Sequence, residues 1–265
     1  MWGYRAVGQD PGMDLGLADR VYVLTGATRG LGFATARYLV DEGARVIVSS
    51  RHQEHVDAAV AELGGLGKVQ GIVADLTAPD TAARLVALAQ SSFGRLDGAL
   101  LSVGGPPPGT ALSVSDDDWR MSFETVFLGA VRTARVIAAA LPSGGAIGLV
   151  LSSSARTPID NLGISNGFRP GLVGVAKDMA DELGPRGVRV VSLLPGRFLT
   201  DRTRAAYGDP ADPTRPRAGA GDDIPLRRVG DAREFGRAAA FVLSPAASYV
   251  TGTSIAIDGG LIRAL

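Results

Sequence analysis

The sequence predicts a three-layer α/β/α protein in a single domain, with helices on both faces of a doubly wound parallel sheet. Short apolar runs of strand length alternate along the chain with longer segments whose apolar residues recur at helical spacing. A glycine-rich turn follows the first of these runs, and neither an internal repeat nor a linker divides the chain. With 265 residues, 46% of them hydrophobic and 20% charged, the chain is long enough to bury one substantial core.

The first predicted strand, residues 21–24, leads into the turn TGATRGLG at residues 25–32 and then into a helix over residues 33–40. The three glycines of this turn allow a tight bend, let a ligand approach the backbone and let the helix pack against the strand. The free amide groups and positive dipole end of the helix would face an anion, most naturally the pyrophosphate of a dinucleotide. A tight turn in any α/β protein would also fit these glycines, so the motif needs support from the rest of the chain.

The later elements follow in the order that parallel strands joined by right-handed crossovers require. Further strands are predicted at residues 44–50, 69–74, 98–102, 146–151, 188–193 and 254–257. Helices are predicted at residues 52–63, 81–92, 116–141 and 232–243, with one more long helix that ends at residue 183. In such a sheet the ligand crevice lies at the carboxyl ends of the strands.

Two segments lie outside this alternation. Residues 200–225 are rich in Pro, Asp, Arg and Gly and lack apolar periodicity, so we expect a lid loop over the mouth of the site, or a disordered surface loop. Residues 1–12 carry no apolar signal-peptide core and are expected to be a disordered extension, with Met13 as a candidate natural start. The single domain would then cover residues 13–265.

Composition excludes several classes of function. Lys plus Arg and Asp plus Glu balance at 27 each, so no basic field points to nucleic acid or to an anionic membrane. The absence of cysteine excludes disulfides, a thiolate nucleophile and a cysteine-ligated metal, and we expect no metal site. No segment approaches the roughly 18 apolar residues that a membrane span needs, so we expect a soluble cytoplasmic protein.

Further motifs follow the glycine turn in a fixed order. They are Asp75-Leu76, Pro195-Gly196 with Thr200, Val250-Thr251-Gly252, and Ile257-Asp258-Gly259-Gly260. Together with TGATRGLG, they make about residues 17–262 resemble a classical short-chain dehydrogenase/reductase, a family with a Rossmann-type fold. The resemblance implies that Asp75 meets the adenine and that the segment from Pro195 to Thr200 touches the nicotinamide and the phosphate.

The end of the second strand decides which nicotinamide cofactor fits. A carboxylate there would bond the ribose hydroxyls of NAD and repel a 2′-phosphate, whereas a cation favours the phosphate. Ser50 aligns with that acidic position, Arg51 follows it, and Arg29 adds a second cation, so we expect NADP; a solvated Arg51 is the alternative. The expected cofactor-binding residues are Gly26, Thr28, Arg29, Gly30, Leu31, Gly32, Ser50, Arg51, Asp75, Leu76, Gly104, Pro195, Gly196 and Thr200.

The resemblance fails at the catalytic residues. Counting back from the following strand places Ser165 where the family has its tyrosine and Arg169 where it has its lysine. The family's asparagine falls at Val126, and the retained serine is Ser153, or Ser152 if the loop differs by one residue. The expected catalytic residues are therefore Ser153, Ser165 and Arg169.

These replacements change the acid–base chemistry. A serine hydroxyl is a weak acid, and Arg169 stays protonated, so it can stabilise developing negative charge but cannot relay a proton. Water held by Ser153, Ser154 and Ser165 is one expected proton source. Tyr207 in the predicted lid is another, although a packing role suits this residue better.

The leading hypothesis is an NADP-dependent oxidoreductase, similar to 3-oxoacyl reductases, that reduces a carbonyl or oxidises an alcohol at an atypical active site. Two alternatives stay open: a redox-inactive NADP-binding sensor or regulator, and a lyase or dehydratase that uses Ser165 and Arg169 as an oxyanion site. The expected partner is a small-molecule substrate whose identity the sequence leaves open. The resemblance also implies a homo-oligomer, a dimer or a tetramer.

Overall fold

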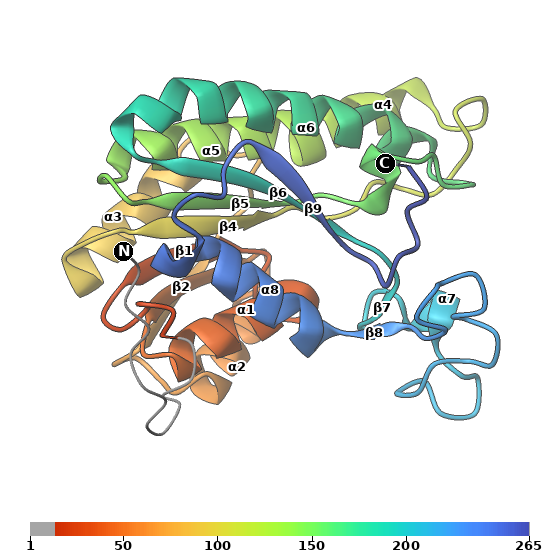
Figure 1. Cartoon of the computed structure of the whole chain (residues 1–265), viewed down its shortest axis with the longest axis horizontal. Helices are drawn as coiled ribbons and strands as arrows, with labels where there is room; N and C mark the ends of the chain where they lie inside the picture. Colours follow the sequence, from red (N-terminus) through yellow and green to blue (C-terminus); the bar gives the residue numbers. More distant parts are fainter. Residues whose placement is uncertain (1–13, 265) are drawn as a thin grey trace, which may run out of the picture.

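The computed structural model describes residues 14–264, so the predicted extension at residues 1–12 and the candidate start at Met13 lie outside the described residues. A seven-stranded parallel sheet in the order β3-β2-β1-β4-β5-β6-β9 forms the middle layer (Figure 1). Its strands are β1 (Val21–Thr25), β2 (Arg45–Ser50), β3 (Val69–Val73), β4 (Gly98–Ser102), β5 (Ala146–Val150), β6 (Arg189–Pro195) and β9 (Thr253–Ile257). The strand order reverses between β1 and β4, which opens the crevice of a doubly wound sheet.

Helices cover both faces of this sheet. They are α1 (Gly30–Asp41), α2 (Gln53–Glu62), α3 (Thr81–Phe93), α4 (Asp116–Ser122), α5 (Gly129–Ala140), α6 (Gly163–Leu183), α7 (Arg204–Tyr207) and α8 (Ala232–Leu243). One buried cluster joins the sheet to α1, α2 and α8, and a second joins it to α3, α5 and α6 (Figure 1). The predicted fold class, a doubly wound parallel sheet in three layers, is confirmed.

Close approach of α1 and α8 depends on one glycine. A Cβ atom on Gly236 would lie 2.7 Å from the carbonyl oxygen of Ala34 in α1, which is closer than side chains pack. Phe235, the residue before it, is completely buried in the same cluster. The helix that follows the lid is therefore fixed against the helix that follows the glycine turn.

Two segments differ from the sequence prediction. The single helix expected over residues 116–141 is interrupted by a π-helical segment, η1 (Phe123–Leu128), which is too short for its wider turn to show in an apolar pattern read over a long window. The segment at residues 200–225 contains the short helix α7, and a two-stranded sheet of β7 (Phe198–Leu199) and β8 (Gly230–Asp231) joins the residues on either side of it. Short 3-10 turns complete the elements at η2 (Ser153–Ala155), η3 (Gly184–Arg186) and η4 (Pro245–Ala247).

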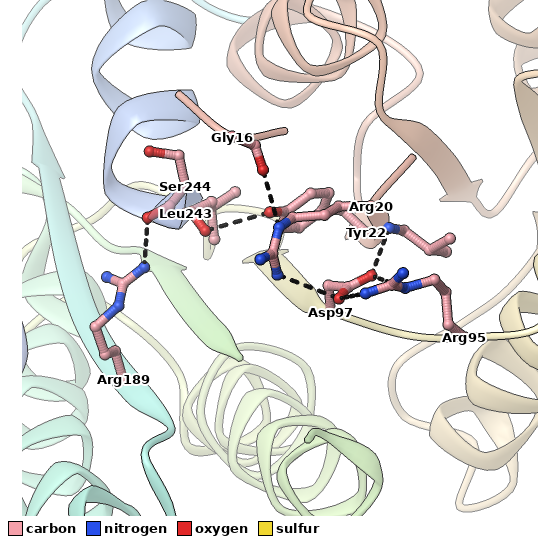
Figure 2. A network of polar contacts seen from close by, with 9 residues as sticks. Gly16, Arg20, Tyr22, Arg95, Asp97, Arg189, Leu243 and Ser244 are labelled. Atoms are coloured by element: carbon pink, nitrogen blue, oxygen red, sulfur yellow. Dashed lines mark hydrogen bonds and ion pairs between the residues drawn. The ribbon is translucent and has the colours of Figure 1, made fainter. Parts of the chain in front are cut away.

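Polar contacts tie together the amino ends of the strands (Figure 2), and the glycine turn follows the opposite, carboxyl end of β1. The Asp97 carboxylate, 2% exposed, accepts the N–H of Val21 at 2.9 Å and the guanidinium of Arg95 at 2.6 and 2.8 Å. Arg189 at the start of β6 donates to the carbonyl of Ser244 at 2.8 Å, at the negative end of α8 (Figure 2). These contacts hold the sheet together at one edge and leave the opposite edge free for a site.

Candidate active site

The glycine turn joins β1 to α1 at the carboxyl edge of the sheet. Gly26 and Gly30 have φ angles of +58° and +59°, where a side chain would be strained. A Cβ atom on Gly32 would lie 2.7 Å from the carbonyl oxygen of Gly26, so a larger residue would push the helix off the turn. Arg29, the N-cap residue, makes no side-chain cap, which leaves amide groups of the first helical turn for another acceptor. Half-buried residues of the turn are Thr28, Gly30 and Leu31.

The segment after β6 closes onto this turn. Pro195 ends β6, and the N–H of Gly196 donates to the carbonyl of Ile257 at 3.0 Å, which fixes the chain where it leaves the sheet. A Cβ atom on Gly30 would lie 3.6 Å from the Thr200 side chain, so Thr200 lies directly beside the glycine turn. Predicted cofactor residues that are 170 positions apart in the sequence are thus neighbours.

Backbone hydrogen bonds bring the ends of β2 and β3 to the same turn. Ala27 donates its N–H to the carbonyl of Ser49 in β2 at 3.3 Å. Ala74, which follows β3, donates its N–H to the carbonyl of Ser50 at 2.9 Å. Asp75 and Leu76 follow directly after this contact, with the Asp75 side chain exposed. The structure therefore groups Ser50, Asp75 and the glycine turn at one edge.

Two exposed arginines belong to this group. Arg29 lies in the glycine turn and Arg51 follows the last residue of β2. Within residues 14–264, neither guanidinium forms an ion pair or a side-chain hydrogen bond. Each is therefore available to an anion from solution, and planar guanidinium groups bind phosphates well.

A pair of buried hydroxyl groups lies at the start of α6. The Oγ atoms of Ser154 and Ser165 are 2.9 Å apart, and Ser165 is 5% exposed. Ser153, the serine expected from the alignment, is buried in the same 3-10 turn, and Ser152 uses its Oγ to accept the N–H of Ser154 at 3.1 Å. The hydroxyl that contacts Ser165 therefore comes from Ser154, which the sequence indicates only as a holder of water.

Arg169 lies one helical turn after Ser165 on the same side of α6 and is 4% exposed. It donates from Nη1 to the carbonyl of Val150 at 3.2 Å and from Nη2 to the carbonyl of Gly104 at 3.4 Å. Its Nε atom is buried and has no hydrogen-bond partner among the described residues. Burial, and then the positive charge of Arg202, lower the pKa of Arg169 to about 10, so the side chain remains a cation at neutral pH.

Arg202 is a site residue that sequence reasoning misses. Its guanidinium occupies the space over Gly105, where a Cβ atom would overlap it. Arg202 is one of many arginines in residues 200–225, and its place two residues after Thr200 is the only signal in the sequence. The Thr203 hydroxyl accepts the N–H of Thr200 at 2.9 Å, which holds the backbone on both sides of Arg202.

Two further residues that the sequence singles out, Val126 and Tyr207, form no side-chain hydrogen bond with Ser165 or Arg169 among residues 14–264. Val126 is 1% exposed in the π-helical segment and offers only methyl groups where the family has an amide. The centre of the Tyr207 ring lies 5.7 Å from the guanidinium carbon of Arg197, so the ring packs against the residue that follows Gly196. Between residues 14 and 264, no three His, Cys, Asp or Glu side chains gather as a metal site, and no helix is both long and apolar enough to cross a membrane.

Comparison with known sequences gives relatives that match almost the whole chain. The family model described as enoyl-(acyl carrier protein) reductase matches residues 26–262. Human dehydrogenase/reductase SDR family member 2, a mitochondrial protein by name, is 34% identical over 249 residues, which are 92% of this chain and 86% of the relative. Bovine dehydrogenase/reductase SDR family member 4 is 34% identical over 257 residues, which are 94% of this chain and 89% of the relative.

Solved structures also match almost the whole chain. L-Sorbose reductase from Gluconobacter frateurii, solved with NADPH and L-sorbose, has a TM-score of 0.85 at 26% identity and covers 96% of this chain and 100% of its own. A 3-ketoacyl-(acyl-carrier-protein) reductase from Brucella melitensis, solved with NADH, has a TM-score of 0.80 at 26% identity, covering 92% of this chain and 99% of its own. Both resemble the present fold over more than nine-tenths of the chain.

Proposed function

Since the chain belongs to the short-chain dehydrogenase/reductase family, we propose that it is an NADP-dependent oxidoreductase with an atypical active site, which reduces a carbonyl or oxidises an alcohol. The observation that carries this proposal is the position of Ser165 and Arg169. Both are buried on α6, and Arg169 bonds to the end of β5 and to the loop after β4, at the edge where the glycine turn lies.

The residues around the glycine turn fit a dinucleotide phosphate. The glycines leave no Cβ atom between the backbone and a ligand, and the amide groups at the start of α1 suit a pyrophosphate. Arg29 and Arg51 would hold the 2′-phosphate that distinguishes NADP from NAD, while Asp75 would meet the adenine. When it is bound, the nicotinamide supplies the hydride for the substrate carbon.

Arg169 and the serine pair would act on the substrate oxygen. A carbonyl that accepts a hydride at carbon develops negative charge on oxygen and then takes up a proton. Arg169 is a fixed buried cation suited to stabilise that charge. In the Ser154–Ser165 pair one hydroxyl donates to the other, which leaves one O–H free to donate to the substrate oxygen, with water restoring the proton.

Substrate class, assembly and the lid are parts of the same proposal. The neighbour that reduces 3-ketoacyl groups supports a small substrate with a carbonyl, similar to a 3-oxoacyl compound. We propose that residues 200–225 form the lid of a domain covering residues 13–265, because the β7–β8 pair anchors the chain on both sides of that segment. We also propose a homo-oligomer, a dimer or a tetramer, in the cytoplasm.

A second candidate function is an NADP-binding sensor without redox activity. It is favoured by the absence of a phenol and an amine at Ser165 and Arg169, because these groups are the family's proton donors and relays. NADPH would bind equally well in both cases. Turnover separates the two, since only the oxidoreductase consumes NADPH when carbonyl compounds are added.

Thermal unfolding with each cofactor tests the choice of NADP. A ligand that binds the folded chain more tightly raises the melting temperature more, so NADPH should give a larger shift than NADH at equal concentration. Arg51→Ser should abolish most of this difference, and the matched variant Arg120→Ser, which removes an exposed arginine from α4, should keep it. Equal shifts for the two cofactors with the unmodified chain would contradict the proposal.

A further inference from the structure

Two guanidinium groups meet at the loop after β4. Arg169 donates to the carbonyl of Gly104 at 3.4 Å, and the guanidinium of Arg202 lies over the next residue, Gly105. Arg202 is also the only charged group that perturbs the pKa of Arg169, and it does so as a like charge. Gly104 therefore contacts the cation of Arg169 from α6, and Gly105 contacts the cation of Arg202 from the lid segment.

Among residues 14–264 no acidic side chain forms an ion pair with either cation. Two arginines that flank the lid segment are neutralised: Arg197 donates to Asp223 at 2.6 Å, and Arg228 donates to Glu234 at 2.6 and 2.7 Å. A buried guanidinium next to a second positive charge is costly unless an anion compensates both. The unpartnered Nε atom of Arg169, in a side chain that is 4% exposed, leaves a donor for such an anion.

We propose that Arg169 and Arg202 together bind a carboxylate of the substrate, so that the enzyme acts on oxo acids or on the corresponding hydroxy acids. The inference rests on the function proposed above and adds the charge of the substrate. Ser165 lies one helical turn from Arg169, so a carbonyl near the serine pair and a carboxylate near Arg202 would both be neighbours of Arg169. Two planar guanidinium groups suit the two oxygens of a carboxylate.

A phosphate group of the cofactor is the alternative anion for the site between Arg169 and Arg202. The start of α1 and Thr200 already offer the pyrophosphate a separate place beside Gly30. A carboxylate that binds at Arg202 should therefore bind with or without NADPH. A phosphate of the cofactor at Arg202 would instead compete with it.

Calorimetric titration of the full chain tests the proposal. The probes are pyruvate, acetoacetate and levulinate, each compared with its methyl ester, because the three acids place the carboxylate at increasing distance from the carbonyl. At least one acid should bind about tenfold or more tightly than its ester, as expected for charge-assisted hydrogen bonds. Arg202→Met should abolish that preference. Gly105→Ala, whose methyl group displaces the guanidinium without removing its charge, should weaken it.

Arg204→Met is the matched control, since it removes a cation from the same segment that already pairs with Asp201 at 2.9 Å. It should keep the preference for the acid. Equal binding of acid and ester in all three pairs, an undiminished preference in Arg202→Met, or loss of the preference when NADPH is present would each overturn the inference. Failure of NADPH to bind, with the preference intact, would contradict the proposed oxidoreductase and leave the carboxylate site supported.

Discussion

The Ser154–Ser165 hydroxyl pair should behave as one catalytic unit, because each hydroxyl orients the other at 2.9 Å. Ser154→Ala and Ser165→Ala should each lower kcat by about a hundredfold to a thousandfold, the range expected for one donating contact to the reacting oxygen. The double variant should lose little more than the worse single variant, since groups that act together are not additive.

Steady-state kinetics of the four forms measures this coupling. Ser91→Ala, on the exposed side of α3, is the matched control and should leave kcat unchanged. Losses that multiply in the double variant would show that the two hydroxyls act independently. Such a result would remove the serine pair as the donor to the substrate oxygen.

Individual residues were predictable from the sequence where backbone geometry demands them. Gly26 and Gly32 leave no room for a side chain, so their spacing marks the turn in any sequence with this fold. The contact between Ser154 and Ser165, and the approach of Arg202 to Gly105, join segments that are 11 and 97 residues apart in the sequence. No local pattern carries that information.

At the scale of elements, the start of α8 contains a charged cap with a defined pH dependence. Asp231 caps the helix, Glu234 accepts the N–H of Asp231 at 2.9 Å, and Arg228 donates to both carboxylate oxygens of Glu234. Arg228 first, and the N–H of Asp231 second, lower the pKa of Glu234 to about 2. Its charged form therefore stabilises the fold above the unfolded pKa of about 4.3, and this stability is lost as the pH falls towards 2.

Glu234→Gln keeps an acceptor for the cap but removes the charge. We expect it to lower the free energy of unfolding by about 1 kcal/mol at neutral pH, since the side chain is exposed enough for solvent to screen the pair. The loss should shrink as the pH falls through that window. Urea unfolding at several pH values measures it, with Glu182→Gln at the exposed end of α6 as control. A loss that is the same at every pH would contradict the assignment.

Strand and helix positions were largely predictable, because buried parallel strands are short, continuous apolar runs between helical patterns. β4 spans the predicted residues, and the other strands of the sheet start and end within one or two residues of expectation. The π-helical segment at Phe123–Leu128 and the short helix α7 were not predictable. The first is too short to stand out in a pattern read over a long window, and the second occurs in a segment with few apolar residues.

At the scale of the whole molecule, the stabilising polar contacts and the candidate site lie at opposite ends of the strands. Asp97, Arg95 and Arg189 fix the amino ends of the strands (Figure 2), and the candidate site occupies the carboxyl ends. A pattern of alternating strands and helices predicts this division, because crossover helices make successive strands parallel and so place all carboxyl ends at one edge. This division locates the candidate site without indicating the reaction.

The central claim is that this chain transfers hydride although Ser165 and Arg169 stand where the family has tyrosine and lysine. The most direct measurement is the rate of NADPH oxidation with a panel of aldehydes, ketones and oxo acids, for the unmodified chain and for Arg169→Met. We predict that the unmodified chain oxidises NADPH with at least one compound, and that Arg169→Met lowers kcat/KM by about a hundredfold while NADPH still raises the melting temperature. Tight binding of NADPH without its oxidation by any compound in the panel would contradict the claim and identify a sensor instead.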